Sequence, residues 1–486
     1  MNMKTYFSKM LPVILLLAIA LPAGAQNEFS GTWSGKIELP GVQLGIQVDL
    51  WQDSAGYHGT IDIPQQGAYG LPLRNVYAST DSVYFELQAG PGLATFSGIP
   101  DGDVITGNFS QAGIRVPFSL DRIRAGSDGR NAARQQKPGL GHGPESAMPK
   151  PYSETEVEVQ SGDIRLACSI TRPLTGTSWP GIILITGSGP QDRDETIFGF
   201  KPFLILAEHL TPQGYIVMRC DDRGAGKSEG NLSTSTSEDL AGDVVAMMDF
   251  LLESGEVERD QFGLLGHSEG GLIAAHVAAL RPETAFVIKM AGPALPGHAI
   301  IRAQSTLIMQ SMGADEDAIA RQDALLTAVF RAIKTDEGWD GIKQSIRDEI
   351  SGQLMSLTPE QTEALPDPDA YIEGYVQQQL SMMQSNWYRY FIQHDPGENL
   401  QQLTMPVLAV FGELDLQVPA ELNAEALDTI LTRAGNTKYT IQILPGANHL
   451  FQKAVTGNPN EYAILEKSFI DGFLDTISQW LAEINQ

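Results

Sequence analysis

The sequence predicts an α/β fold, in which a mostly parallel sheet carries helices on both faces, preceded by a separate antiparallel all-β domain. Three observations support this prediction. Short alternating strands fill residues 27–122, continuous apolar strands alternate with helical segments from residue 152 on, and the strands stop between residues 295 and 403. Continuous apolar strands separated by helices are typical of a parallel sheet that is covered on both faces.

The first 25 residues have the pattern of a secretory signal peptide. Lys4 and Lys9 precede an apolar run from Leu11 to Leu21, and Ala23-Gly24-Ala25 supplies small residues for cleavage. This run is too short for a membrane-spanning helix, and no later stretch reaches the roughly 20 apolar residues that such a helix needs. No Cys follows the cleavage signature, which argues against a lipoprotein. We therefore expect a chain that begins at Gln26 and is exported to the periplasm or the extracellular medium.

Composition limits the class of the protein and its partners. The 486 residues suffice for two or three domains of about 100–200 residues each. With 42% hydrophobic and 19% charged residues, the chain is typical of globular proteins rather than disordered ones. The formal net charge of −27 disfavours nucleic acid and anionic membranes as partners. The oligomeric state cannot be predicted from these features.

The chain has two cysteines, Cys168 and Cys220, and both lie in strand-like runs. Two cysteines in so long a chain form no disulfide framework. Buried free thiols are therefore the simpler interpretation, and a disulfide is the alternative. The sequence contains no CxxC, no HExxH and no clustered His and Cys spacing, so we expect neither a metal site nor a cofactor.

Residues 26–124 are expected to form a small antiparallel barrel or sandwich similar to lipocalin-like domains. Apolar and polar residues alternate in 45–50 and 82–87, as in half-buried strands. Residues 125–151 are rich in Gly, Pro, Gln and Ser and are expected to be a linker. The aromatic residues of the β domain are interpreted as core filling rather than as a ligand surface: Trp33, Trp51, Tyr57 and Phe109.

The parallel sheet is expected to be built from two separated segments, residues 152–294 and 404–486. Residues 295–403, which lie between them, have helical patterns such as DAIARQDALLTAVFRAI and YIEGYVQQQLSMMQ. An insertion that leaves the sheet at the carboxyl ends of its strands lies over the edge where ligands bind in open α/β sheets. We therefore expect 295–403 to form a helical cap.

The stretch from Phe262 to Ala279, FGLLGHSEGGLIAAHVAA, is the strongest functional signal. A short apolar strand leads into Gly266-His267-Ser268-Glu269-Gly270, and a helical pattern follows. A strand, a G-x-S-x-G turn and a helix form a nucleophile elbow, in which glycines permit the tight bend beside the serine. A plain Gly-rich turn between a strand and a helix is the alternative.

A serine hydroxyl needs a base to remove its proton and an acid to orient that base. Asp415 follows the apolar strand VLAVFG, and His449 follows a later strand in ILPGANH. The order Ser268, Asp415, His449 is the one that this sheet architecture uses for its catalytic residues. Glu413 lies two residues before Asp415 and is the alternative acid.

Together with the elbow, three further stretches make residues 155–486 resemble the α/β-hydrolase superfamily. They are Thr186–Asp194 (TGSGPQDRD), Cys220–Ser228 (CDDRGAGKS) and Phe411–Asp415 (FGELD), and they match the family's oxyanion loop, its D-x-R-G-x-G-x-S turn and its acid-bearing strand end. The resemblance is to secreted bacterial serine esterases with an N-terminal β domain. It implies an α/β-hydrolase fold with an inserted helical cap.

The resemblance also implies an oxyanion hole made of two backbone N–H groups. One donor is expected to be Glu269, and the other Ser188 or its neighbour Gly187. Many relatives have His-Gly where this chain has Thr186-Gly187, which leaves the choice of the second donor open. A Gly-rich turn without a catalytic role is the alternative for this loop.

Several charged side chains near these motifs are interpreted as structural. His267 is expected to pack rather than to react, and the Glu269 carboxylate to be solvated or paired with a loop. Arg193 and Arg223 are expected to anchor loops through ion pairs with the aspartates at positions 192, 194, 221 and 222.

Together these features predict an exported serine hydrolase that cleaves small carboxylic esters with short to medium acyl groups through an acyl-enzyme. A serine peptidase or amidase of the aminopeptidase type, using the same residues, is the first alternative. The second is a carbohydrate- or lipid-binding module, centred on the β domain, with vestigial activity.

Overall fold

The computed structural model describes residues 29–123, apart from gaps at 40–41, 54–55, 64–67, 90–91 and 112–113, and residues 150–355 and 368–484, apart from 463. The predicted signal peptide and nearly all of the predicted linker lie outside these residues. Within the described part of the chain, no helix combines the length and the apolar character that a membrane span requires.

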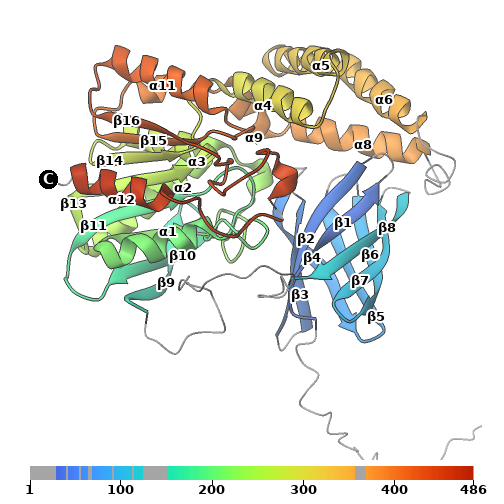
Figure 1. Cartoon of the computed structure of the whole chain (residues 1–486), viewed down its shortest axis with the longest axis horizontal. Helices are drawn as coiled ribbons and strands as arrows, with labels where there is room; N and C mark the ends of the chain where they lie inside the picture. Colours follow the sequence, from blue (N-terminus) through green and yellow to red (C-terminus); the bar gives the residue numbers. More distant parts are fainter. Residues whose placement is uncertain are drawn as a thin grey trace, which may run out of the picture.

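The N-terminal domain is a closed antiparallel barrel (blue in Figure 1). Its strands are β1 (Gly31–Leu39), β2 (Val42–Asp53), β3 (Gly56–Ile63), β4 (Ala68–Ser79), β5 (Ser82–Ala89), β6 (Gly92–Asp101), β7 (Val104–Gln111) and β8 (Ile114–Arg122). Each strand pairs with the next, and β1 pairs with β8 to close the barrel. The predicted all-β domain is confirmed, and it is a barrel rather than a sandwich.

The predicted core role of the barrel aromatics holds for some of them. Trp33 and Phe109 are buried in the barrel core, and Tyr57 packs against that core with its ring edge-on to Phe29. Trp51 is 46% exposed and stacks on His58 at the outer surface, so its predicted burial was wrong. The side chains of a strand alternate between the two faces, and Trp51 follows the inward-facing Leu50.

The second sheet has eight strands in the order β16-β15-β14-β13-β11-β12-β10-β9. These strands are β9 (Tyr152–Ser161), β10 (Ile164–Pro173), β11 (Trp179–Ile185), β12 (Ile216–Cys220), β13 (Val257–His267), β14 (Phe286–Met290), β15 (Val407–Gly412) and β16 (Tyr439–Leu444). Strand β10 runs antiparallel to β9 and β12, and the strands from β12 to β16 run parallel to one another. The predicted mostly parallel sheet is confirmed.

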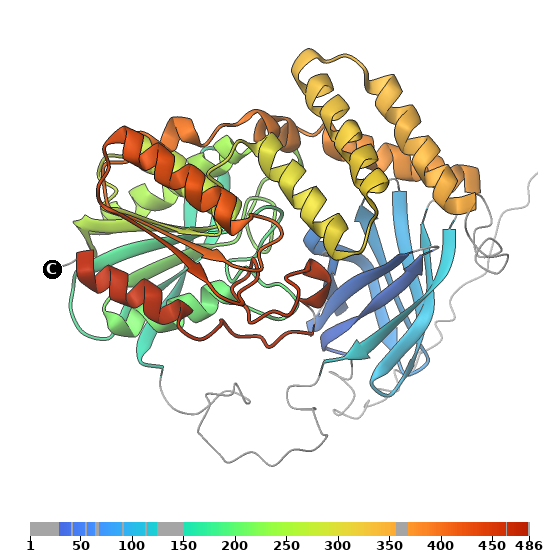
Figure 2. The same ribbon diagram turned by 45° about the horizontal axis from the view of Figure 1, so that its top comes forward.

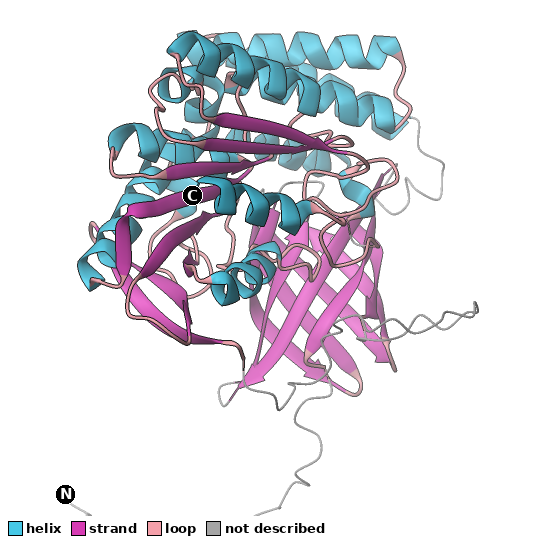
Figure 3. Cartoon of the chain, turned by 60° about the vertical axis from the view of Figure 1, so that its left-hand side comes forward, coloured by secondary structure: helices cyan, strands magenta, loops and turns pink. Residues whose placement is uncertain are grey.

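Helices cover both faces of this sheet (Figure 3). The apolar side chains of α1 (Pro202–Leu210) and α12 (Phe473–Ile484) form one buried cluster with the sheet. Those of α2 (Ser237–Ser254), α3 (Glu269–Leu280) and α11 (Ala420–Ala434) form a second cluster with it. Three short 3-10 segments, η2 (Thr211–Gln213), η3 (Leu232–Thr234) and η4 (Pro459–Glu461), lie in the connections.

The chain between β14 and β15 forms the predicted helical insertion. Its helices are α4 (Gly297–Ser311), α5 (Glu316–Thr335), α6 (Trp339–Met355), α8 (Pro368–Met383), α9 (Asn386–Gln393) and α10 (Gly397–Leu400). Figures 1 and 2 show α5, α6 and α8 extending from the sheet domain across the end of the barrel. Leu354 of α6 and Tyr371 of α8 pack against the barrel core. The insertion therefore contacts the barrel as well as the sheet domain.

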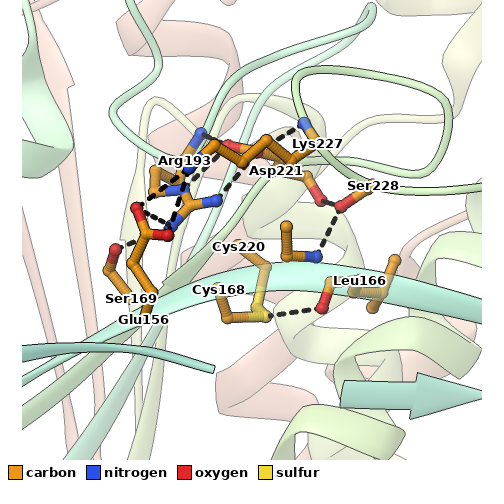
Figure 4. Close-up of a disulfide and its surroundings, with 10 residues drawn as sticks. Glu156, Leu166, Cys168, Ser169, Arg193, Cys220, Asp221, Lys227 and Ser228 are labelled. Atoms are coloured by element: carbon orange, nitrogen blue, oxygen red, sulfur yellow. Dashed lines mark hydrogen bonds and ion pairs between the residues drawn. A yellow bond between two sulfur atoms is a disulfide. The ribbon is translucent and has the colours of Figure 1, made fainter. Parts of the chain in front are cut away.

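Cys168 and Cys220 form a disulfide (Figure 4), so the simpler interpretation as free thiols was wrong. The two residues lie directly opposite each other in the antiparallel pair of β10 and β12. That pairing depends on the position of β12 in the sheet, between β10 and β11. The residues around each cysteine carry no information on this position.

Candidate active site

Ser268 occupies a sharp turn between β13 and α3. Its backbone has φ 52° and ψ −119°, a conformation that side-chain-bearing residues rarely adopt. Such a conformation costs about 1–3 kcal/mol and persists only where the surrounding structure enforces it. Here the Ser268 N–H donates to the Met290 carbonyl oxygen at 2.8 Å, which ties the turn to the end of β14.

The two glycines of the G-x-S-x-G turn are sterically required. A Cβ on Gly266 would lie 2.0 Å from the Gly270 carbonyl oxygen, and a Cβ on Gly270 would lie 2.1 Å from the Ile185 carbonyl oxygen. Both contacts involve backbone atoms, which cannot move aside as a flexible side chain could. Only glycine at both positions lets the turn close against the end of β11.

His449 and Asp415 lie together at the carboxyl edge of the sheet. The His449 Nδ1 and Asp415 Oδ2 atoms are 2.7 Å apart, and both side chains are buried. The other Asp415 oxygen, Oδ1, accepts the backbone N–H groups of Gln417 and Val418 at 2.8 and 2.9 Å. Three donors thus fix the carboxylate, which in turn orients the imidazole.

The alternative acid, Glu413, faces a different group. Its side chain is exposed, and its Oε2 accepts the Gly446 N–H at 2.8 Å. It therefore holds the turn before the His449 loop rather than the His449 ring.

The loop after β11 lies directly against the serine turn. A Cβ placed on Gly187 would be 3.3 Å from the Ser268 Cβ. The Gly187 N–H donates to Glu195 Oε1 at 2.7 Å, so the suggested use of Gly187 as an oxyanion donor was wrong. Within the described residues, the N–H groups of Ser188 and Glu269 donate to no protein acceptor.

The Glu269 side chain is buried rather than solvated, contrary to one of its two predicted states. Its carboxylate accepts hydrogen bonds from Ser188 Oγ at 2.6 Å, from Ser237 Oγ, and from Trp387 Nε1 at 2.9 and 3.0 Å. Trp387 belongs to α9 of the cap. This carboxylate therefore joins the loop after β11 to the cap, next to Ser268. The contact with Trp387 could not be predicted, because the two residues are 118 positions apart and no local pattern links them.

Two aspartates that directly follow Cys220 hold the loop after β11, and Figure 4 shows the first of them, Asp221, with Arg193 of the loop. Arg193 donates to Asp221 through Nε and Nη2, both at 2.9 Å, as an ion pair of the predicted kind. Asp222 accepts the Thr186 hydroxyl at 2.6 Å and the Gln191 N–H at 3.0 Å. Burial raises the pKa of Asp222 well above its usual range, although these two hydrogen bonds oppose the shift.

The second predicted anchor, Arg223, pairs with a residue outside the expected set. Its Nε and Nη2 each lie 2.7 Å from an oxygen of Asp243 on α2. The partner is 20 residues away on a helix, beyond the neighbouring aspartates that the sequence offered. In the described residues, no group of three or more His, Cys, Asp and Glu side chains is arranged to hold a metal ion.

Two family models match the sheet domain and the cap. The model described as "Serine aminopeptidase, S33" matches residues 202–337, and the model of the prolyl oligopeptidase family matches residues 361–475. Both matches fall within the part of the chain that contains the serine turn, the cap and the His449 loop.

Individual relatives are similar over about two-thirds of the chain. Esterase EstD of Thermotoga maritima is 25% identical over 342 residues, which cover 70% of this chain and 70% of that protein. Est1E from Butyrivibrio proteoclasticus, solved with ferulic acid, matches at TM-score 0.38 and 16% identity, over 68% of this chain and 97% of that chain. A thermophilic esterase from Thermogutta terrifontis matches at TM-score 0.36 and 20% identity, over 68% of this chain and all (100%) of that chain. The sheet order and the strand–turn–helix at Ser268 are those of an α/β-hydrolase fold, and the sequence matches support a serine hydrolase.

Proposed function

We propose that the protein is an exported serine esterase that cleaves carboxylic esters with short to medium acyl groups. Ser268 acts as the nucleophile, His449 as the general base and Asp415 as the acid that orients it. The observation that carries this proposal is the 2.7 Å contact between His449 and Asp415, in a loop whose His449 carbonyl oxygen lies 3.0 Å from Nε2 of His267, the residue before the strained Ser268. A buried carboxylate on Nδ1 fixes the tautomer that leaves Nε2 able to accept a proton.

The proposed reaction proceeds through two tetrahedral intermediates. His449 Nε2 takes the proton of Ser268 Oγ as this oxygen bonds to the ester carbonyl carbon. The intermediate collapses to an acyl-enzyme, the bond to the alcohol oxygen breaks, and His449 returns its proton to that oxygen. Water, deprotonated by His449, then attacks the acyl carbon, and the acid leaves as Ser268 regains its proton.

The backbone N–H groups of Ser188 and Glu269 hold the negative oxygen of each intermediate in this proposal. Neither group donates to an acceptor within the described protein, so both are available to the substrate. One such donor contributes roughly 3–4 kcal/mol to transition-state stabilisation.

Two observations support an ester substrate of modest size. The relative with 25% identity over 342 residues is named an esterase. The cap lies close over the serine, because Trp387 of α9 hydrogen-bonds the side chain of Glu269, the residue after Ser268. A closely applied cap favours small acyl groups.

An amide substrate is the second candidate, because both matching family models are named for peptidases. Turnover of p-nitrophenyl acetate, butyrate and octanoate, compared with turnover of aminoacyl-anilides, separates the two. We expect kcat/KM to be highest for acetate or butyrate. A higher kcat/KM for an anilide would contradict the ester assignment and favour the peptidase.

Export is proposed from the signal-peptide pattern of residues 1–25. The Cys168–Cys220 disulfide supports it, because such bonds persist in oxidising compartments. Expression of the full chain followed by mass spectrometry of the periplasmic and secreted fractions should give a mature N-terminus at Gln26. A chain that keeps Met1 in the cytoplasmic fraction would contradict export.

A further inference from the structure

Glu195 and His267 form a buried charged pair beside the proposed active site. Glu195 is 1% exposed and His267 is 3% exposed, and Glu195 Oε1 lies 2.8 Å from His267 Nδ1. Glu195 follows the oxyanion loop, and His267 immediately precedes Ser268. The pair therefore joins the two segments that must meet at the reacting carbonyl.

Each member of the pair also holds the backbone of a catalytic loop. Glu195 Oε1 accepts the Gly187 N–H at 2.7 Å, and His267 Nε2 lies 3.0 Å from the carbonyl oxygen of His449. A carbonyl oxygen and a carboxylate oxygen are both acceptors, so both ring nitrogens of His267 must carry protons. With Glu195 ionised, the geometry therefore requires an imidazolium.

The surroundings of His267 favour this charged form. Burial disfavours it, but the Glu195 carboxylate and the more distant Asp415 outweigh burial and raise the pKa of His267 above its usual 6.5. The ring of His449 faces His267 with ring centroids 4.8 Å apart. The ordinary assignment of a neutral packed histidine therefore does not fit this position.

Two features of Glu195 are energetically unfavourable. Its backbone has φ 52°, a left-handed conformation that is strained for glutamate. Its second oxygen, Oε2, is buried and has no hydrogen-bond partner among the described residues. A buried oxygen without a hydrogen-bond partner is unfavourable. The attraction between the Glu195 carboxylate and the His267 imidazolium must therefore offset this penalty.

We propose that Glu195 and His267 are positioning residues that set the oxyanion loop and the His449 loop around Ser268. Glu195 binds the Gly187 N–H, which leaves Ser188 as the loop's donor to the oxyanion. His267 binds the His449 carbonyl oxygen, which fixes the backbone that carries the catalytic base. The inference rests on the proposed roles of Ser268, His449 and Ser188.

Glu195→Gln tests the pair, because it keeps an Oε1 acceptor of the same shape and removes only the charge. The neutral His267 ring can then donate from one nitrogen, so one of its two contacts is lost. We expect kcat to fall about 10- to 100-fold, as for a misplaced catalytic group, with KM changed less than about threefold. The alkaline limb of the kcat profile should move to lower pH, because the unpaired ring loses its proton more easily.

His267→Gln is the second variant, since an amide cannot donate on both sides, and it should lower kcat to a similar extent. Glu256→Gln is the matched control, because it removes a part-buried ion pair with Arg172 that lies at the amino end of β13. The control should keep the wild-type kcat and pH profile. If His267→Gln does not fold, Glu195→Gln alone tests the proposal, because it only replaces one oxygen by an NH2 group.

The protonation state of His267 can be measured without any turnover. In ¹³C-histidine-labelled protein, NMR spectra of wild type and His267→Gln assign the ring among the 8 histidines. We expect an imidazolium at pH 7.5 in wild type and a neutral ring in Glu195→Gln. A neutral ring in wild type, or a Glu195→Gln variant with wild-type kcat and pH profile, overturns the inference. A wild type inert toward every ester and toward a fluorophosphonate probe refutes the proposed function instead, and the NMR result then still decides the state of the pair.

Discussion

At the scale of single residues, the site distinguishes two carboxylates that stand close together in the sequence. Asp415 is buried, bonds His449 and accepts two backbone N–H groups, whereas Glu413 is exposed and accepts the Gly446 N–H. Only a buried carboxylate on Nδ1 can hold the imidazole in one tautomer and stabilise its charged form. The two residues should therefore differ sharply in their effect on rate.

Asp415→Asn should lower kcat about 10⁴-fold, because the amide favours the wrong tautomer of His449. Glu413→Gln is the matched variant two residues away, and it should leave kcat within a few-fold of wild type. Steady-state hydrolysis of p-nitrophenyl butyrate checks both. Equal losses in the two variants would contradict the assignment of the acid.

Lys289 is a second residue whose setting has measurable consequences. It is fully buried at the end of β14, and its Nζ donates to the carbonyl oxygens of Gly271 at 2.8 Å and Pro293 at 3.2 Å. Burial lowers its pKa from 10.5 to about 7. The amine thus links the first turn of α3, just after Ser268, to the loop that begins the cap.

The lowered pKa of Lys289 predicts a pH dependence of stability. Between about pH 7 and pH 10.5 the unfolded chain keeps the proton that the folded chain has lost, so the free energy of unfolding rises with pH. The rise is at most about 1.4 kcal/mol per pH unit. Lys289→Met should flatten the rise of Tm from pH 7 to pH 10, whereas Lys227→Met, at an exposed lysine, should not. Parallel curves for wild type and Lys289→Met would show that Lys289 is already charged in the folded state.

At the scale of elements, the disulfide ties two neighbouring strands directly beneath the oxyanion loop. It joins β10 to β12, and β12 ends at Cys220, immediately before the two aspartates that hold that loop. Figure 4 shows Arg193 and Asp221 beside the bond. The cross-link therefore restrains the end of β12, from which the two aspartates that bind the loop extend.

Removal of the disulfide should destabilise the sheet domain. The bond closes a loop of 52 residues, for which chain entropy gives a stabilisation of roughly 4 kcal/mol. The double variant Cys168→Ala/Cys220→Ala should therefore unfold at a Tm several degrees below wild type. Wild type denatured with dithiothreitol present should show the same decrease. An unchanged Tm in both experiments would mean that the bond does not constrain the unfolded chain.

The elements themselves show which parts of the structure the sequence could predict. The serine turn was predictable because β13, Ser268 and α3 are contiguous, and because Gly266 and Gly270 report a local steric need. The Cys168–Cys220 bond and the Glu195–His267 pair were not, because each depends on which strand ends lie side by side. Their partners are separated by 52 and 72 residues, and no local pattern records such a neighbour.

At the scale of the whole molecule, the cap connects the barrel to the proposed active site. Tyr371 of α8 packs against the barrel core, and Trp387 of α9 hydrogen-bonds Glu269 beside Ser268. Figures 1 and 2 show the cap helices reaching over both domains. The sequence predicted the barrel and the cap as separate units, but their contact could not be predicted, because the apolar residues of α8 would equally suit a core within the cap.

This contact predicts that the barrel and the cap unfold together. Tyr371→Ala removes a large, partly buried side chain from the shared interface, at a cost of roughly 1–3 kcal/mol. Calorimetry should then resolve a separate barrel transition below that of the sheet domain. Tyr77→Ala, at a residue 55% exposed on the barrel, should leave the wild-type profile unchanged. A Tyr371→Ala profile identical to wild type would contradict the coupling.

The proposed mechanism requires that Ser268 becomes acylated, and this can be measured directly. Wild type and Ser268→Ala are compared in hydrolysis of p-nitrophenyl butyrate and in labelling by a fluorophosphonate, with the labelled peptide identified by mass spectrometry. We expect wild type to turn over the ester and to carry the label on Ser268, and Ser268→Ala to do neither. If Ser268→Ala hydrolyses the ester at the wild-type rate, or the label falls on another residue, the proposed mechanism is wrong.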